Sequence, residues 1–266
     1  MTESIPLDHP RRESLLLREK IEKGWEEGLV AKVGLVAHGR GEAFDYLLGE
    51  TSTDIAQKAT RKAALLLLMA KRPVISINGN TAVLARDRML ELASILTKKR
   101  ETPCPLEINI FYRTPQRMKK LLTFMQDKRY PEVKVLGGKE DARIPGLNSE
   151  RAKCDSDGIF SSDVAFVPLE DGDRCEALMR MGKTVISVDL NPFSRTARTA
   201  TLTIVDNIVR VIPLLIAEIS ALPTDPDSLE KLLFLERITN QDSLAQSAEI
   251  IRIRISDFEK HPTIEY

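Results

Sequence analysis

Cysteine, histidine and tryptophan are scarce in this sequence of 266 residues, which contains three, three and one of them, respectively. The cysteines are widely spaced and include no Cys-x-x-Cys pair, so neither a disulfide framework nor a zinc ribbon is expected. The histidines, His9, His38 and His261, lack the spacing of metal ligands. We therefore expect reduced thiols in a cytoplasmic protein that has no metal site of its own.

An excess of one sign of charge is also missing. Lysine plus arginine, at 39, equals aspartate plus glutamate, at 39, so the formal net charge is zero. This balance argues against a protein that binds nucleic acid through a basic surface. The longest apolar run, Ala63–Ala70, is far too short to span a bilayer, and the charged N-terminus has no apolar signal core. We expect neither nucleic acid nor a membrane as a partner.

Several catalytic motifs are absent. No phosphate-binding loop ends in Gly-Lys-Ser/Thr, which argues against a standard nucleoside triphosphatase. The pair Gly39 and Gly41 lacks the third glycine of a dinucleotide fingerprint, and no Gly-x-Ser-x-Gly elbow occurs. Hydrolase, redox and zinc-enzyme interpretations all lose support.

What the sequence does contain is a regular alternation of short strands and helices. Runs rich in β-branched residues predict strands at 74–77, 106–111, 133–136, 164–168, 184–188 and 201–205. Helices fit between them at about 81–98, 115–127, 173–181 and 207–221. Such βαβ units predict an α/β fold, a Rossmann-like doubly wound, mostly parallel sheet with helices on both faces. Pro213 lies inside the last helix, which would make that helix kink or begin later.

Helical segments flank this core on both sides. Apolar residues at four-residue spacing, such as Leu17 and Ile21, predict an N-terminal helix. Residues 34–46 contain three glycines and are predicted to form a loop that leads into a short helix, and residues 54–72 form a further helix. After a proline-rich turn, two charged amphipathic helices make up the tail. We therefore divide the chain into an N-terminal helical segment packed on the core (1–72), a Rossmann-like core (73–222) and a C-terminal helical tail (223–266), together one compact unit.

Polar segments follow four of the predicted strands. In a parallel sheet the carboxyl ends of the strands share one edge, where the ligands of doubly wound folds bind. The segments expected at this edge are Asn78–Asn80, Tyr112–Thr114, Leu169–Arg174 and Asp189–Thr196. In the last segment, Asp189 can accept hydrogen bonds from ribose hydroxyls and Arg195 can face phosphate. The alternative is a turn that Asp189 caps, with Arg195 in solvent.

Three further groups have a functional and a structural interpretation each. His38 and Arg40 lie among glycines, which either let the backbone approach a ligand closely or form a tight turn with solvated side chains. Asn80 or Thr81 can cap a helix, and the same helix start can bind an anion. Arg113 is either a phosphate clamp or a solvated arginine.

Taken together, these segments resemble the archaeal phosphopantothenate synthetases, also called 4-phosphopantoate–β-alanine ligases. The resemblance extends from about residue 9 to residue 211. The motifs that carry it are Leu17–Lys20, His38–Leu47, Ile77–Asn80, Phe111–Thr114, Arg143–Leu147, Leu169–Arg174, Asp189–Pro192 and Ile204–Ile208. The sequence departs from the family in a longer linker at 97–105, in Cys175 where a threonine is usual, and in a divergent C-terminal tail.

This resemblance implies an ATP-dependent ligase of coenzyme A synthesis. Such an enzyme activates the carboxylate of 4-phosphopantoate as an acyl-adenylate, releases pyrophosphate, and lets β-alanine displace AMP to give 4′-phosphopantothenate. ATP would be a substrate that brings Mg²⁺ with it, there would be no tightly bound cofactor, and the protein would be a homodimer. The ATP contacts that the resemblance implies are Arg18, Arg40, Asp189, Leu190, Asn191, Arg195, Thr196, Asn207 and Ile208.

The other substrates are less sharply defined by the sequence. We expect 4-phosphopantoate near Asn78, Gly79, Asn80 and Arg113. The candidates for catalysis are His38 and Arg40. The alternative function is a non-catalytic binding protein that responds to a nucleotide or to coenzyme A. The density of charged groups at the expected ligand edge favours the enzyme, because a sensor needs fewer of them.

Overall fold

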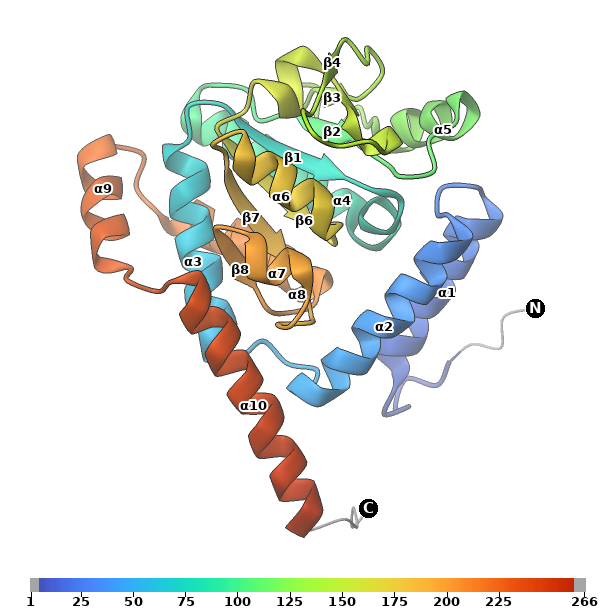
Figure 1. Cartoon of the computed structure of the whole chain (residues 1–266), viewed down its shortest axis with the longest axis vertical. Helices are drawn as coiled ribbons and strands as arrows, with labels where there is room; N and C mark the ends of the chain where they lie inside the picture. Colours follow the sequence, from blue (N-terminus) through green and yellow to red (C-terminus); the bar gives the residue numbers. More distant parts are fainter. Residues whose placement is uncertain (1–4, 261–266) are drawn as a thin grey trace.

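A six-stranded parallel sheet forms the centre of the molecule (Figure 1). The computed structural model describes residues 5–260, so His261 and the last residues of the predicted tail lie outside it. The strands are β1 (Pro73–Ile77), β2 (Leu106–Ile108), β3 (Val135–Leu136), β6 (Val164–Pro168), β7 (Thr184–Val188) and β8 (Leu202–Ile204). Their order is β3-β2-β1-β6-β7-β8, and all neighbours are parallel. The strand order therefore reverses between β1 and β6, which confirms the doubly wound α/β fold.

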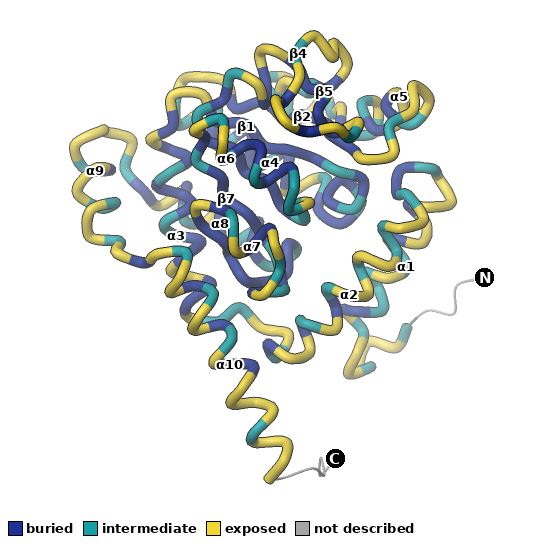
Figure 2. Tube along the Cα trace, viewed as in Figure 1, coloured by how far each residue is buried: buried dark blue, intermediate teal, exposed yellow. Residues whose placement is uncertain are grey.

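Both faces of the sheet are covered, which explains why most residues of its strands are apolar. Alternate residues of a strand point to opposite faces, so Ile75 and Val74 of β1 belong to different cores. The first core includes side chains of α3 (Asp54–Met69), α4 (Gly79–Arg100), α5 (Pro115–Met125) and α8 (Ile208–Ala221). The second core includes α6 (Gly172–Arg180), and Figure 2 shows the central strand β1 as buried along its length.

Polar caps begin the helices that follow the strands. The side chains of Asn78, Thr114 and Asn207 accept hydrogen bonds from backbone N–H groups in the first turns of α4, α5 and α8. Helix α8 begins at Ile208, one residue after the predicted start, and continues to Ala221 with Pro213 inside it, so the alternative of a later start is wrong.

The N-terminal segment is a hairpin of two helices, α1 (Arg12–Glu26) and α2 (Lys32–Leu48). Helix α1 packs against α4, and α2 contacts α10 (Asn240–Lys260) (Figure 1). The predicted loop at 34–46 is therefore wrong, because the whole segment lies inside α2. The glycine at 34 serves helix packing instead of a turn: a Cβ there would lie 2.4 Å from Oδ1 of Asn80.

The tail consists of the two helices expected, α9 (Pro226–Leu235) and α10. Five short elements were not predicted from the sequence: α7 (Arg195–Thr199), the antiparallel pair β4 (Ala142–Arg143) and β5 (Lys153–Cys154), the 3₁₀ turn Glu150–Ala152 and the π-helical turn Ser156–Phe160. These elements are too short to show a period. The three cysteines, Cys104, Cys154 and Cys175, are free and buried. No helix within residues 5–260 is long and apolar enough to cross a membrane.

Candidate active site

A cleft of about 1040 Å³ lies at the carboxyl edge of the sheet. One side, here called the sheet wall, consists of residues 78–80, 169–172, 189–191, 194–196 and 207–208. The other side, here called the helix wall, consists of the cleft-lining residues of α1 and α2. The lining includes every predicted site residue except Arg18 and Arg113. The volume is at the upper end of the usual range for ligand pockets, roughly 300–1000 Å³, so there is room for more than one small substrate.

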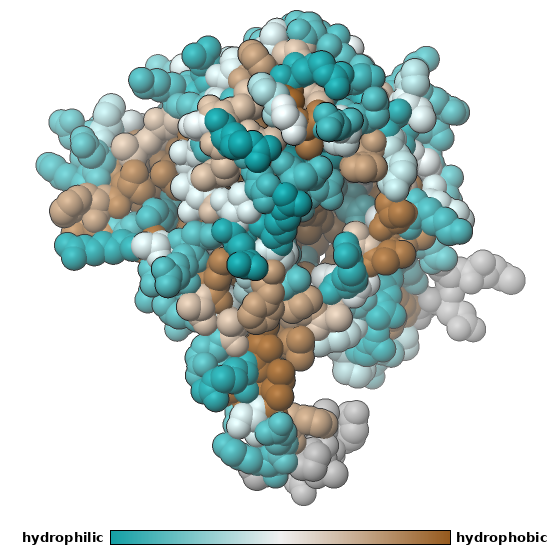
Figure 3. Space-filling view, in the orientation of Figure 1, coloured by the Kyte–Doolittle hydropathy of each residue, from teal (hydrophilic) through white to brown (hydrophobic). Residues whose placement is uncertain are grey.

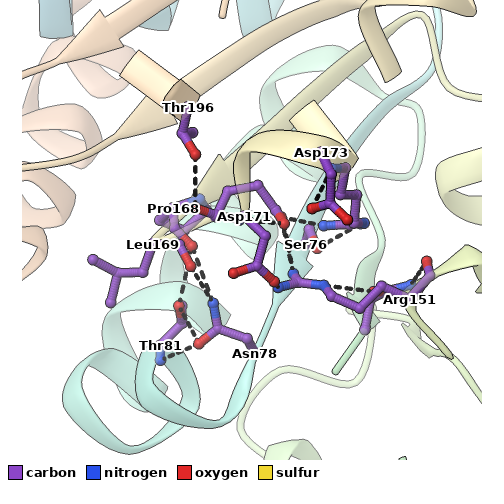
Figure 4. A network of polar contacts seen from close by, with 12 residues as sticks. Ser76, Asn78, Thr81, Arg151, Pro168, Leu169, Asp171, Asp173 and Thr196 are labelled. Atoms are coloured by element: carbon purple, nitrogen blue, oxygen red, sulfur yellow. Dashed lines mark hydrogen bonds and ion pairs between the residues drawn. The ribbon is translucent and has the colours of Figure 1, made fainter. Parts of the chain in front are cut away.

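Asn78 links the carboxyl ends of β1 and β6, the two strands between which the strand order reverses. Its Nδ2 donates to the carbonyl oxygen of Leu169 at 2.9 Å, and its Oδ1 accepts from the backbone N–H of Thr81 at 3.0 Å (Figure 4). Asn78 is thus the cap of α4, and the predicted caps Asn80 and Thr81 are wrong. Asn80 instead donates from Nδ2 to the carbonyl oxygen of Gly34 at 2.8 Å, which ties the sheet wall to the helix wall.

The loop after β6 rests on a buried network of charges (Figure 4). The Glu170 carboxylate, 1% exposed, pairs with Arg174 and, at 2.9 Å, with Arg151. Arg174 also donates from Nη2 to Oγ of Ser76 at 3.1 Å. Leu169, just before this network, has a left-handed backbone with φ of 55°. Such strain persists only where the surroundings impose it, and it occurs most often at ligand sites.

Asp189 organises the segment after β7. Its carboxylate accepts from the backbone N–H of Asn191 at 2.9 Å and from the hydroxyl of Ser194, which itself caps α7. Burial raises the pKa of the Asp189 carboxyl, and the positive charge of Arg40 opposes that shift. Asp189 therefore does stabilise a turn, as the structural alternative predicted, and this turn lines the cleft.

The other predicted nucleotide contacts also have protein partners. Arg195 forms a bidentate ion pair with Glu176 at 2.5 and 2.6 Å, and it is 62% exposed. Thr196 donates from Oγ1 to the carbonyl oxygen of Glu170 at 2.8 Å. Asn207 caps α8 and donates from Nδ2 to Asp45 at 2.8 Å. Leu190 and Ile208 are buried apolar residues of the lining, 7% and 1% exposed.

The helix wall is different, because its two cations have no partners among the described residues, although its carboxylates Glu42 and Asp45 are paired. Arg40 and Lys20 are exposed and form no hydrogen bond or ion pair with any residue that the structure describes. His38 is half-buried, and its buried Nε2 has no hydrogen-bond partner within residues 5–260. Burial lowers the pKa of the His38 imidazole, so its neutral form is favoured near neutral pH.

Two predicted residues lie outside the cleft. Arg18 pairs with Glu42 through two hydrogen bonds of 2.8 Å and lines a neighbouring cavity of about 380 Å³ between α1 and α2. Arg113 donates to the carbonyl oxygen of Gly137 at 2.6 Å and pairs with Glu140 at 3.0 Å. The predicted pairing of Arg113 with the Asn78–Asn80 turn is therefore not what this structure has.

Arg117, which the sequence analysis missed, lines the cleft beside that turn. It donates from Nε and Nη2 to the carbonyl oxygen of Leu29, and a Cβ at Gly79 would lie 2.7 Å from its Nη2. The signal that could have found it is its place three residues after the cap Thr114, in the first turn of α5. Arg151 was not predicted either, because nothing in its local sequence indicates that it pairs with Glu170 and Asp171 of the loop after β6.

A group of three or more side chains suited to hold a metal ion is not present within residues 5–260. Any Mg²⁺ in this cleft would have to be bound largely by phosphate oxygens, as is usual for Mg²⁺ that enters with a nucleotide.

Comparison with known proteins agrees with this geometry. The family model described as phosphopantothenate/pantothenate synthetase matches residues 55–254. The chain belongs to this family. A relative from Thermococcus kodakarensis is 48% identical over 253 residues, 95% of this chain and 94% of its own length. Relatives from Methanosarcina mazei and Methanospirillum hungatei are 50% and 41% identical and cover 78% and 94% of this chain and 79% and 98% of their own lengths. All three are named 4-phosphopantoate–β-alanine ligases. The resemblance inferred from the sequence motifs is confirmed.

Proposed function

We propose that this protein of the phosphopantothenate synthetase family is a 4-phosphopantoate–β-alanine ligase, an enzyme of coenzyme A biosynthesis. The observation that carries the proposal is the near full-length similarity to relatives of that name. The cleft supports it, because the polar residues that the motifs contribute line one cavity at the switch point of the sheet. No observation on the described residues favours the alternative of a non-catalytic binding protein.

The reaction has two steps, and neither needs a nucleophile from the protein. First, a carboxylate oxygen of 4-phosphopantoate attacks the α-phosphorus of ATP, the bond to the β-phosphate breaks, and pyrophosphate leaves. Second, the amine of β-alanine, after losing one proton, attacks the acyl carbon. The bond from that carbon to the AMP oxygen breaks, AMP leaves with the electron pair, and the nitrogen loses its second proton. The contribution of the protein is to hold the substrates in line and to stabilise the charge that develops.

In this proposal ATP, with its Mg²⁺, occupies the half of the cleft at β7 and β8. Asp189 accepts from the ribose hydroxyls, while Arg40, Arg195 and Thr196 face the phosphates. The backbone at Leu190 and Asn191 lies beside the base, and Asn207 and Ile208 close that end. Arg18 can join only after leaving Glu42, which holds it in the structure described here.

The acid occupies the half of the cleft at β1 and β2. The Asn78–Asn80 turn begins α4, and the positive end of a helix dipole favours a phosphate dianion. Arg117 supplies the counter-charge in place of Arg113, because Arg117 lines the cleft and Arg113 does not. Arg40 and His38 then lie across the cleft, on the helix wall, as the candidates for contact with the reacting groups.

We also propose that the protein acts as a cytoplasmic homodimer. Ile255 and Phe258 of α10, 45% and 63% exposed, continue a stripe from Ile251, which belongs to a buried cluster with Leu48 of α2 and Val205, the residue after β8. Figure 3 shows apolar side chains along this helix. Light scattering on the purified protein should give twice the mass of one chain, and Phe258→Glu should lower that mass.

Incubation of the protein with ATP, Mg²⁺, 4-phosphopantoate and β-alanine tests the function. We expect AMP and phosphopantothenate in equal amounts, and neither product when 4-phosphopantoate is omitted. Nucleotide binding without AMP would support the non-catalytic alternative and contradict the proposal.

A further inference from the structure

Asp171 differs from the other two carboxylates at the strand ends, Glu170 and Asp189. Glu170 is buried between two arginines, and both oxygens of Asp189 accept hydrogen bonds. Asp171 stands at the start of α6, but its side chain makes no hydrogen bond to that helix. It is 49% exposed, lines the cleft, and uses one oxygen, Oδ2, to accept from Nη1 of Arg151 at 2.5 Å. One face of this carboxylate is therefore open to the cleft.

The position of Asp171 is between the two halves of the cleft. The Leu169 carbonyl on one side of it is bound by Asn78, which belongs to the β1 end. Gly172 on the other side packs against Arg195, where a Cβ would lie 2.6 Å from Cγ of that arginine. The loop thus contacts both the half proposed for the acid and the half proposed for ATP, where the activated acyl group must meet the incoming amine.

The Asp171 side chain is also held in place from behind. Arg151 donates from Nε to Oδ1 of Asn109 at 3.2 Å and pairs with Glu170 at 2.9 Å, so its guanidinium has little freedom (Figure 4). A fixed carboxylate with an open oxygen suits a ligand ammonium group, since charge-assisted hydrogen bonds to an ammonium are roughly twice as strong as neutral ones.

We infer that Asp171 binds the ammonium group of the amino-acid substrate, β-alanine, and that Arg151 is the positioning residue for this carboxylate. The inference rests on the proposed function and deepens it by assigning the amine subsite. It requires that Asp171 matter for the second step of the reaction and not for the first.

The test separates the two steps in the purified full-length protein. Exchange of labelled pyrophosphate into ATP, with 4-phosphopantoate and without β-alanine, reports the first step alone. Phosphopantothenate formation over a range of β-alanine concentrations reports the second. The variants are Asp171→Asn, which keeps the shape and loses the charge, and Asp171→Glu, which keeps the charge. Asp173→Asn is the matched control, because Asp173 lies two residues after Asp171, in the first turn of α6, and does not line the cleft.

We expect Asp171→Asn to raise the KM for β-alanine about tenfold or more and to change pyrophosphate exchange less than twofold. Asp171→Glu should recover part of the loss, and Asp173→Asn should behave like the parent. Hydroxylamine, a nucleophile that is neutral at neutral pH, should trap the acyl group equally well with the parent and with Asp171→Asn.

Other outcomes overturn the inference. An unchanged KM for β-alanine in Asp171→Asn would show that the ammonium binds elsewhere. Loss of pyrophosphate exchange in that variant would place Asp171 with Mg²⁺ and ATP, or in the stability of the fold. Absence of both exchange and product in the parent protein would instead overturn the proposed function, and the inference with it.

Discussion

The polar side chains of the sheet wall and the cations of the helix wall are in opposite states. On the sheet wall, Asn78, Asp189 and Asn207 are already held by hydrogen bonds to the backbone or to neighbouring side chains. On the helix wall, Lys20 and Arg40 have no partner among the described residues. The comparison indicates that the sheet wall is preorganised for recognition, whereas the helix wall supplies charge that only a ligand can neutralise.

Arg40 should give the largest effect, because it is the guanidinium of the helix wall and has no partner among the described residues. We expect Arg40→Ala to lower kcat/KM by about 10²–10³-fold, the usual loss when one hydrogen-bond donor to the charge that develops in a transition state is removed. Arg40→Lys should recover little, since an ammonium cannot make the two parallel bonds of a guanidinium. Steady-state kinetics with saturating β-alanine measures both. Near-normal turnover of Arg40→Lys would place Arg40 in solvent and remove the contrast between the walls.

Asp189 tests the sheet wall. Loss of its charge-assisted hydrogen bonds should weaken ATP binding by about 1.5–3 kcal/mol, measured by calorimetry. The fold should lose less, because β7 itself is buried by its neighbours. Ser194→Ala is the control, since it removes the hydroxyl that donates to Asp189 and caps α7, and it leaves the Asp189 carboxylate in place. Equal ATP affinity in Asp189→Ala and the parent would contradict the ribose role.

Arg117 and Arg113 make a matched pair of smaller changes. Arg117→Ala should raise the KM for 4-phosphopantoate about tenfold, because it removes a charged donor beside the α4 start. The KM for ATP should stay nearly unchanged. Arg113→Ala should alter neither KM and should lower the melting temperature, since Arg113 binds Gly137 and Glu140 outside the cleft. The reverse result would restore the phosphate role first predicted for Arg113.

His38 should give the smallest effect, visible mainly through pH. Burial lowers the pKa of His38 from its ordinary value of 6.5. Below that value the unfolded chain takes up a proton that the folded chain resists, so the His38 contribution to stability is lost as the pH falls. The parent should therefore lose more thermal stability than His38→Gln between neutral and mildly acidic pH. If the melting temperatures of the two proteins fell by the same amount as the pH is lowered, His38 would not be buried in its neutral form.

Much of the sheet could be predicted because the local sequence of a strand is sufficient to indicate where the strand lies. The strands at 164–168 and 184–188 have the predicted bounds, since short apolar runs that contain β-branched residues and lie between turns favour a strand buried on both faces. The two-core arrangement follows from the same pattern.

The errors arose where a residue depends on a distant partner. The glycine at 34 indicates a turn when taken alone, and its close approach to Asn80 of another helix and to Val30 explains it inside α2. The strand β2 ends at Ile108, three residues before the predicted end, which shifts the loop after it and turns Arg117 instead of Arg113 into the cleft. Arg151 reaches Glu170 across nineteen residues, and no local pattern encodes that contact.

The most direct test of the central claim is the fate of the carboxylate oxygen of 4-phosphopantoate. The substrate would be prepared with heavy oxygen in that carboxylate and turned over once with ATP, Mg²⁺ and β-alanine. An acyl-adenylate formed in this cleft requires one labelled oxygen to appear in the phosphate of AMP, and mass spectrometry of AMP detects it. Label in inorganic phosphate, or AMP without label, would contradict the account.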